Sequence, residues 1–390
     1  MKKLFLTLSV IVALAAGACD DAVPTGPDGA SFDSGRAGPS VLNVMTWNIY
    51  VGADLTQLLA VGGLEDVPCA VFGVWQDVIA TDFPTRAVAI ADQIEASRPH
   101  VIGLNEVSTF AFTFGSTPDL VFLDILLAEL DSRGLNYDAE ATSTNFQVAL
   151  PIAYTDQCPA APQDELTYTE YDVVLVRDDV ETTGAANGTY AAVLPLPLPG
   201  GITLEKPSGW AFVDILHKDL PYRVFSTHLE PADIGPCTTH PDLLELHYYQ
   251  ALELMGILAA SEVPTILTGD LNSDASGCTT ATYPDLIEAG FVDAWTLGRP
   301  LGQGFTSNQA DDLQNATSEL FHRIDFILYR DAFTAAGGNF RGSSHAERVG
   351  EEPGDRIASS ATGSSVMLWP SDHAGVVAEL RIAPGRGHRK

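Results

Sequence analysis

Short apolar runs that end in, or enclose, an acidic, amide or imidazole side chain recur along this 390-residue chain. The runs are rich in β-branched and aliphatic residues, which is typical of buried strands. Their polar residues are Asn48, Glu106, His228, Asp270 with Asn272, Asp325, and Asp372 with His373. Because ligand sites of α/β folds gather at the carboxyl ends of strands, we expect these side chains to share one pocket.

Each of these residues also has a purely structural explanation. Asn48 and Asn272 suit turns, Glu106 and Asp270 suit helix caps, and His228 suits a hydrogen-bonded core position. As a set they are harder to explain by packing, since a buried carboxylate costs several kcal/mol unless a cation compensates it. Carboxylate and amide oxygens suit Mg²⁺, Mn²⁺ or Ca²⁺, and histidines beside carboxylates suit proton transfer near neutral pH. This combination is typical of phosphoester hydrolysis.

The hydrophobic pattern predicts a layered α/β fold rather than an alternating barrel, because strands are spread through the chain with few helices between them. Strands are expected over 41–47, 101–104, 171–176, 210–216, 222–227, 265–268, 324–328 and 374–380, and helices over 85–97, 120–130 and 242–260. Pro221 is expected in a hairpin turn, and the stretches 299–320 and 331–368 are expected to be surface loops. Residues 41–385 are expected to form one domain.

The N-terminus has the pattern of an export signal. Met1–Ala18 combines two lysines, a short apolar stretch and a small-residue cleavage site. Cys19 follows directly, in a segment that resembles a bacterial lipoprotein box. We expect a lipid anchor on Cys19 and a flexible tether over 19–40, with plain secretion as the alternative.

The four remaining cysteines, in an exported protein, indicate two disulfides. Three pairings are possible, and the sequence does not decide among them. We favour Cys69–Cys158 with Cys237–Cys278, which avoids crossing the two halves of the chain. A zinc site is the alternative, but no C-x-x-C spacing supports it.

The charge balance excludes a passive basic groove for nucleic acid. The chain has 51 acidic and 20 basic side chains, a formal net charge of −31. Such a surface repels polyanions, although it permits an enzyme that meets phosphate through a metal ion. Four arginines remain candidates for local phosphate contacts: Arg86, Arg177, Arg223 and Arg323.

Residues 41 to about 383 resemble the endonuclease/exonuclease/phosphatase superfamily, the deoxyribonuclease I-like fold. The resemblance rests on short motifs in a fixed order. They are Thr46-Trp47-Asn48, Leu104-Asn105-Glu106, Ser226-Thr227-His228-Leu229, Thr268-Gly269-Asp270-Leu271-Asn272, Arg323-Ile324-Asp325 and Ser371-Asp372-His373. The resemblance implies a four-layered α/β sandwich, with two mixed β-sheets packed face to face and helices outside.

The resemblance also implies roles for these residues. The implied metal ligands are Glu106, Asn48 and Asp372, and the ion is Mg²⁺, with Mn²⁺ or Ca²⁺ as alternatives. The implied catalytic residues are Asp270 and Asn272 for the water and the phosphate, Asp325 with His373 for acid–base catalysis, and His228 for a phosphate oxygen. Glu170 is the implied partner of His228, or else an ordinary exposed acid. Asn105 departs from the pattern, because the family usually has Gln there.

We therefore expect an exported, divalent-metal-dependent phosphoesterase, with a nuclease-like phosphodiesterase as the first choice. A sphingomyelinase or phospholipase C-like enzyme and a small-molecule phosphatase are the alternatives. A phospholipase would need membrane-inserting aromatic hairpins, for which 71–75 and 110–114 are candidates. The non-enzyme alternatives are an inactive surface binding module and a structural calcium-binding protein. The expected partners are a phosphoester substrate (nucleic acid, phospholipid or small phosphoester) and the membrane; we expect a monomer without a protein partner.

Overall fold

A computed structural model describes residues 40–115, 117–235, 237–298, 303–331, 340–361 and 366–382. These residues belong to one compact unit, Gly38–Lys390. The expected signal Met1–Ala18, the anchor Cys19 and the tether up to residue 39 lie outside the described residues. Within the described ranges, no helix is both long enough and apolar enough to span a bilayer.

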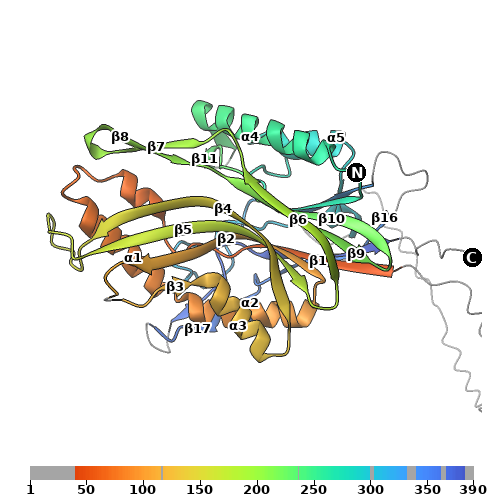
Figure 1. The fold of residues 1–390 in the computed structure, drawn as a ribbon, viewed down its shortest axis with the longest axis horizontal. Coiled ribbons are helices and arrows are strands. Elements are labelled where there is room, and N and C mark those ends of the chain that lie inside the picture. Colours follow the sequence, from red (N-terminus) through yellow and green to blue (C-terminus); the bar gives the residue numbers. More distant parts are fainter. Residues whose placement is uncertain are drawn as a thin grey trace, which may run out of the picture. The chain divides into compact units, whose positions relative to one another are not determined.

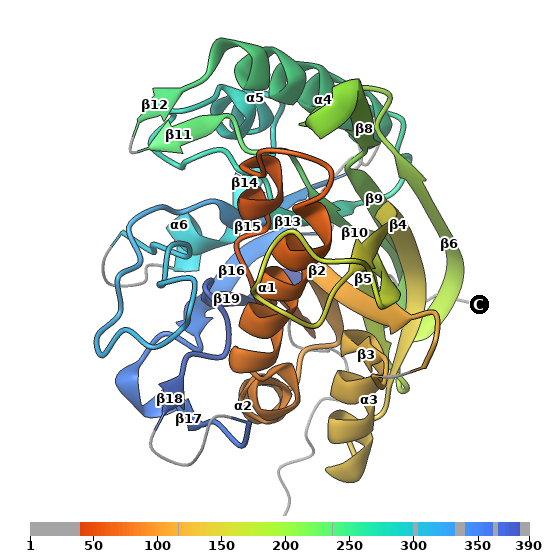
Figure 2. The ribbon, with the colours of Figure 1, turned by 90° about the vertical axis from the view of Figure 1, so that its left-hand side faces the viewer.

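Two large mixed sheets form the centre of the fold (Figures 1 and 2). The first has the order β16-β19-β1-β2-β5-β4, with β3 added on β2, and the second has the order β14-β15-β13-β10-β9-β6. The first sheet comprises β1 Ser40–Asn48, β2 Val101–Phe112, β3 Leu120–Val121, β4 Tyr137–Ile152, β5 Asp164–Arg177, β16 Phe340–Val349 and β19 Gly375–Ile382. The second comprises β6 Glu181–Thr189, β9 Gly209–His217, β10 Leu220–His228, β13 Thr265–Asp270, β14 Val292–Asp293 and β15 Asp325–Arg330.

Helices cover the outer faces of both sheets. They are α1 Val67–Ala80, α2 Phe83–Ser97, α3 Phe122–Ser132, α4 Pro241–Ala259 and α5 Thr282–Glu288. The short helix α6 Ala294–Gly298 instead contributes Ala294 and Trp295 to the apolar cluster between the sheets. Short pieces complete the fold: η1 Leu55–Leu59, η2 Pro199–Gly201, η3 Pro353–Asp355, β7 Leu194–Leu198, β8 Ile202–Lys206, β11 Asp233–Gly235, β12 Thr238–Thr239, β17 Ile357–Ala358 and β18 Met367–Leu368.

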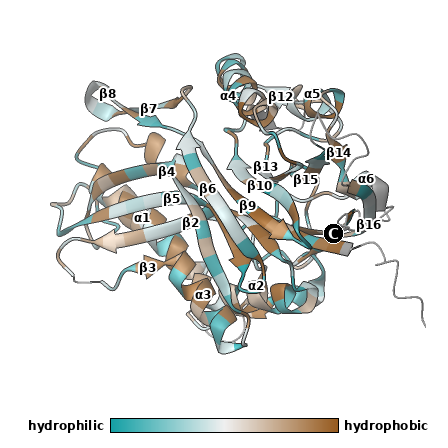
Figure 3. Ribbon diagram, turned by 45° about the vertical axis from the view of Figure 1, so that its right-hand side comes forward, coloured by the Kyte–Doolittle hydropathy of each residue, from teal (hydrophilic) through white to brown (hydrophobic). Residues whose placement is uncertain are grey.

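Alternation along the strands separates the layers. Val44 of β1 packs with Val213 and Val224 of the second sheet, so the two sheets meet face to face. Its neighbour Met45 points the other way and joins the cluster that contains α1, α2 and α3. On the far side, Leu267 of β13 packs in a cluster with residues of α4 and α5. Figure 3 shows the hydrophobic residues concentrated on the strands and on the adjoining helix faces. The expected four-layered α/β sandwich is therefore confirmed.

Some expected elements differ from the observed ones. The expected loop over 331–368 was wrong in part, because its residues 340–349 form β16 at the edge of the first sheet. Pro221 lies inside β10 opposite Leu216, and the turn consists of Lys218 and Asp219, which both have positive φ. Residues 71–75 lie within α1 and do not form a hairpin. The long strand β4, which was not expected, has many polar residues on its exposed side.

Both favoured disulfides are present. Cys69 of α1 is bonded to Cys158 in the connection between β4 and β5, and Cys237 is bonded to Cys278. The first bond joins the helical layer to the end of the first sheet, across 89 residues of sequence.

A hairpin outside the two large sheets is formed by β7 and β8, which pair only with each other among the described strands. The β7 sequence alternates Leu and Pro, and its leucines are half-buried while Pro195 and Pro197 are exposed. The hairpin therefore has one apolar inner face, opposite η1.

Candidate active site

The strand ends expected to converge do so at one end of the sandwich. Asn48 at the end of β1 lies opposite Asn105 of the parallel strand β2. In the second sheet, His228 of β10 lies opposite Asp270 of β13, which in turn lies opposite Asp325 of β15. The parallel pairs β1–β2 and β10–β13 thus end at the same edge.

Glu106 occupies an irregular point in β2. Its φ is +56°, and the pairing with β5 slips between Leu104 and Val107. This bulge directs the carboxylate towards β1, where Asn48 Nδ2 and the backbone N–H of Val51 donate to it, each at 2.9 Å. Burial by itself raises the pKa of Glu106, but His228 and the Asn48 hydrogen bond lower it below the ordinary value.

The orientation of the Asn48 amide is fixed by its neighbours. Its Oδ1 accepts a hydrogen bond from the Tyr50 backbone N–H at 3.1 Å, while Nδ2 also donates to Asp270 at 3.2 Å. Rotating the amide by 180° would place two donors against each other, so this orientation is preferred. Asn48 therefore holds Glu106 and Asp270 through its nitrogen.

His373 and Asp325 form a buried pair. His373 Nδ1 lies 2.9 Å from Asp325 Oδ2 and 3.8 Å from Asp270 Oδ2. Burial lowers the pKa of His373, but Asp325 and Asp372 together raise it well above its ordinary value. Asp270 has its pKa raised to about 6 by burial and then by the nearby Asp325.

His228 is surrounded by acidic and amide groups. Its Nε2 lies 3.1 Å from Asn272 Nδ2 and 3.6 Å from Asp270 Oδ2, and its Nδ1 lies 3.9 Å from Glu170 Oε1. Because an amide nitrogen donates, a neutral His228 carries its proton on Nδ1, facing Glu170. Burial lowers the pKa of His228, but Asp270 and the other carboxylates raise it overall. Glu170 also accepts from the Tyr168 hydroxyl at 3.2 Å.

Asp372 is positioned from the opposite side by the segment before β19. Ser371 Oγ donates to the Asn48 backbone oxygen at 2.6 Å, which ties this segment to the end of β1. Burial and the nearby charge of Glu106 raise the pKa of Asp372 to about 7, although His373 lowers it. The carboxylates of Asp372 and Glu106 therefore repel each other in the folded chain.

Two further buried residues belong to the site: Asp172, which was not expected from the sequence, and Asn105, which was expected only as a departure from the family pattern. Asn105 Nδ2 donates to Asp172 Oδ1 at 2.7 Å, and Asn105 Oδ1 accepts from the Asp270 backbone N–H at 3.1 Å. Burial raises the pKa of Asp172 to about 6. The available signal was an acid inside the expected strand 171–176, directly before Val173-Val174-Leu175, because such a position on a strand is normally aliphatic.

The four arginines considered for phosphate contacts are all engaged elsewhere. Arg86 is fully buried and donates to the backbone oxygens of Thr81, Ile49, Tyr50 and Pro370. Arg177, Arg223 and Arg323 are paired with Asp179, Asp214 and Asp293, respectively. The expectation that these side chains form a phosphate surface was therefore wrong.

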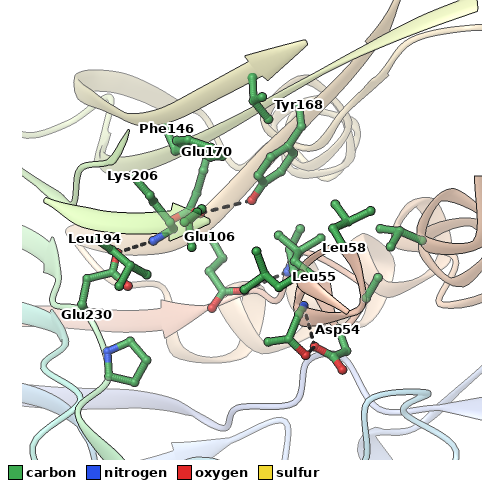
Figure 4. A pocket seen from close by; sticks show the side chains of 18 of the residues that line it. Asp54, Leu55, Leu58, Glu106, Phe146, Tyr168, Glu170, Leu194, Lys206 and Glu230 are labelled. Carbon is green, nitrogen blue, oxygen red and sulfur yellow. Dashed lines mark hydrogen bonds and ion pairs between the residues drawn. The ribbon is translucent and has the colours of Figure 1, made fainter. Parts of the chain in front are cut away.

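A cavity of about 450 Å³ opens on these groups. Six of the expected site residues line it: Glu106, Glu170, His228, Asp270, Asn272 and His373. Figure 4 shows Glu106 and Glu170 at one side of the cavity, with leucines of η1 and β7 around it. The expected convergence is thus observed, while the role of each residue stays a prediction.

The family model for the Endonuclease/Exonuclease/phosphatase family matches residues 45–373. The chain belongs to this family. Its members are metal-dependent hydrolases of phosphoester bonds, so the chain is an enzyme of this class and the inactive-module alternative is set aside.

Several solved structures are similar to the chain. A Bacteroides thetaiotaomicron protein of the same family has 16% identity and a TM-score of 0.52, over 91% of this chain and all of its own, 100%. A Bacteroides thetaiotaomicron mannosyl-6-phosphatase has 16% identity and a TM-score of 0.49, covering 87% of this chain and 99% of its own. TDP2 from C. elegans has 17% identity and a TM-score of 0.47, covering 87% and 75%. No curated protein sequence matches the chain.

The donor set fits the divalent ion that the family requires. Among the described residues, the ligand atoms of Asp270, Asp325 and His373 lie within 4.8 Å of one another, and Asp325 Oδ1 is buried without a hydrogen-bond partner. The raised pKa values of Asp270 and Asp372 also indicate that negative charge is held here at a cost. A cation would relieve that cost.

Proposed function

We propose that the chain is an exported hydrolase that cleaves a phosphodiester by in-line attack of water with the help of a divalent ion. The observation that carries this proposal is the meeting of two imidazoles, His228 and His373, with buried carboxylates around one cavity. Imidazoles paired with carboxylates transfer protons near neutral pH, and general acid–base catalysis is typically worth about 10²–10⁴-fold.

Glu106 and Asp372 are the proposed ligands of the ion, with Asn48 beside them. All-oxygen ligands favour Mg²⁺, with Mn²⁺ or Ca²⁺ as alternatives. When bound, such an ion polarises a phosphoryl oxygen and stabilises developing negative charge. Asn48 orients the Glu106 carboxylate, since its nitrogen donates to that group and its oxygen is already bonded to Tyr50.

His373 is the proposed acid–base residue. Asp325 holds its Nδ1, which leaves Nε2 as the nitrogen that exchanges a proton. Asp270 is proposed to orient the attacking water, because its buried carboxylate lies between the two imidazoles.

His228 is proposed to donate to a phosphate oxygen in its protonated form, which the nearby Glu170 stabilises. Asn272 holds the other nitrogen of His228 and also donates to the Leu229 backbone oxygen at 2.7 Å, so we propose it as a positioning residue.

The test is hydrolysis of bis-p-nitrophenyl phosphate by the purified protein with Mg²⁺, Mn²⁺ or Ca²⁺. We expect release of p-nitrophenolate that stops when EDTA is added and returns with excess metal. A folded protein that releases none with any of the three ions contradicts the proposal.

We also propose that the chain acts outside the cytoplasm, held to a membrane through Cys19. The support is the Met1–Ala18 signal pattern and the two disulfides, which form in oxidising compartments. Metabolic labelling with a radioactive fatty acid tests the anchor. Labelling of the native chain and none of Cys19→Ser is expected, and an unlabelled native chain would show plain secretion.

A further inference from the structure

The cavity next to the proposed catalytic groups continues well beyond them, and its far part is apolar. Phe146, Val148 and Leu150 of β4 line it on the sheet side. Leu55 and Leu58 of η1 line the opposite side, as Figure 4 shows for the labelled leucines. A phosphate and its attacking water need only the polar end, so the apolar extension has no part in the chemistry described above.

The hairpin closes a third side of this cavity with aliphatic groups. Leu194 and Leu196 of β7 and Leu204 of β8 line it, and the alternation of the strand turns Pro195 and Pro197 outward. Leu196 lies directly opposite Leu204 in the hairpin register. The inner face of the hairpin is therefore mainly aliphatic, with Lys206 opposite Leu194 at one end.

Exposed aliphatic side chains also mark the rim of the cavity. Leu59 of η1 lines the cavity and is 41% exposed, and Leu64 is 48% exposed and lies against the hairpin turn at Gly200. Ile202, which follows that turn, is 45% exposed. A rim of this kind costs free energy in water and suits contact with an apolar ligand.

Charge does not favour a nucleic acid in this space. Lys206 is the only lysine or arginine among the described residues that line the cavity, and it forms an ion pair with Glu230. Grooves that bind single-stranded nucleic acid combine positive charge with stacking aromatic side chains, and the described lining has aromatic side chains but no unpaired lysine or arginine. A sugar would likewise need polar partners along the walls, where the lining away from the catalytic groups is mainly leucine, valine and phenylalanine.

We propose that the apolar part of this cavity binds the hydrocarbon chain of an amphipathic phosphoester, with the phosphate at Glu106, His228 and His373. This inference rests on the proposed function, because it uses the same catalytic groups. It assigns the substrate class as an aliphatic phosphoester rather than nucleic acid. The chain contributes binding free energy by leaving water, and the leucine walls exclude substrates whose attached groups are polar.

The test uses soluble p-nitrophenyl alkyl phosphates with methyl, butyl and octyl chains, below their micelle concentrations and with Mg²⁺ present. Water oxygen forms a new bond to phosphorus, and the bond from phosphorus to the p-nitrophenyl oxygen breaks. The leaving p-nitrophenolate takes that electron pair, and the alkyl phosphate keeps the new oxygen while one proton goes to solvent. The reacting bond is the same in all three substrates, so differences in kcat/KM report the chain.

We expect kcat/KM to rise at least tenfold from methyl to octyl, mainly through KM, since each buried methylene typically strengthens binding about fourfold. In Leu196→Asp the octyl-to-methyl ratio is expected to fall towards one. The matched control is Ile287→Asp, at an exposed position of α5 outside the cavity, which is expected to keep the wild-type ratio.

The outcomes separate the two proposals. If no substrate is hydrolysed, the proposed function fails; if the methyl ester is hydrolysed and the octyl ester is no better, only the chain-binding inference fails. Plasmid DNA cleaved more efficiently than the octyl ester also overturns it. If Leu196→Asp does not fold, the kcat/KM values of the wild-type protein for the methyl, butyl and octyl esters still test the chain-binding inference. Vesicles of phosphatidylcholine then identify the source: cleavage of vesicle lipid assigns a membrane substrate, and cleavage of the soluble ester alone assigns a free amphiphile.

Discussion

Asn105 Oδ1 accepts a hydrogen bond from the backbone N–H of Asp270 at 3.1 Å, which joins the first sheet to the second at the active site. The same side chain donates to Asp172 at 2.7 Å. The family usually has Gln at this position, and the shorter Asn side chain still spans the two groups. One amide therefore links two buried acids on opposite sheets.

Asn105→Ala is expected to destabilise the protein by about 2–4 kcal/mol, because it leaves two buried polar groups without partners. Urea unfolding measures this loss. Asn136→Ala, which removes a hydrogen bond to Asp178 on the surface, is the control and is expected to change stability by no more than about 0.5 kcal/mol. Equal decreases in the free energy of unfolding of the two variants would show that the buried hydrogen bonds of Asn105 stabilise the protein no more than a surface hydrogen bond does.

His373→Ala is expected to lower turnover at least about a hundredfold, since it removes the proposed acid–base group. Asp270→Ala is expected to do the same. Hydrolysis of bis-p-nitrophenyl phosphate measures both, and circular dichroism confirms that the variants are folded. His345→Ala, at an exposed position of β16, is expected to retain wild-type turnover. Near-normal turnover in folded His373→Ala would remove this residue from the mechanism.

Glu106→Gln is expected to weaken binding of Mn²⁺ by at least about tenfold, because it removes a negative oxygen ligand. Titration calorimetry measures the affinity without any turnover. The control is Glu288→Gln, at the exposed end of α5, which is expected to bind Mn²⁺ with the affinity of the native chain. If Mn²⁺ binds Glu106→Gln and the native chain equally well, the ion lies elsewhere, and the group of Asp270, Asp325 and His373 is the next site to test.

Stability is expected to fall in mild acid through His100. Burial, together with Arg177 and His217, lowers the pKa of His100 from 6.5 to about 4, and its Nδ1 accepts a hydrogen bond from the Asn43 backbone N–H. The unfolded chain therefore binds this proton first as the pH falls. The contribution of neutral His100 to the free energy of unfolding is therefore fully present above about pH 6.5 and is lost progressively as the pH falls towards 4.

Between pH 7 and pH 5 the expected loss from His100 is about 1–2 kcal/mol, reduced for its partial exposure. Urea unfolding at the two pH values measures it. His100→Asn keeps an acceptor for the Asn43 N–H and does not titrate, so its stability is expected to fall less over the same range. A variant with the full wild-type pH dependence would assign the effect to other groups.

Arg86→Met is expected to cost about 3–5 kcal/mol of stability, because four backbone oxygens lose a buried cationic partner. The carbonyls of Ile49 and Tyr50 lie next to Asn48, and that of Pro370 lies close to Asp372, so Mn²⁺ affinity is expected to fall as well. Arg381→Met, at an exposed position of β19, is the control for both measurements. Unchanged Mn²⁺ affinity in folded Arg86→Met would limit Arg86 to a structural role.

The meeting of the proposed catalytic groups could be predicted from the sequence because each interrupts or follows an apolar strand. His228 and Asp270 follow runs of aliphatic residues, and the parallel pairing of β10 with β13 is enough to bring them together. The positions of Asn48 and Glu106 follow in the same way from β1 and β2. Such local patterns predict which groups meet, whereas the distances between them depend on sheet packing.

The apolar cavity could not be predicted, because its walls come from segments with no common pattern. Leu196 lies in a Leu-Pro repeat, which is typical of a loop. Leu55 belongs to a short 3-10 helix, and Val148 lies in a strand with many polar residues. The burial of Arg86 was missed for a related reason, since its partners are backbone carbonyls that no sequence pattern reveals. Features built from backbone groups and distant segments appear only in three dimensions.

The bond between Cys69 and Cys158 links two segments that adjoin the lining of the cavity. Cys69 shares α1 with Val71 and Val74, which line the cavity, and Cys158 lies in the connection between β4 and β5, which supply the facing wall. Oxidation therefore restrains the relative movement of two segments that border the proposed ligand space. In a reducing compartment the same chain would lose that bond, so the proposed selectivity for chain length is expected to depend on the redox state of its surroundings.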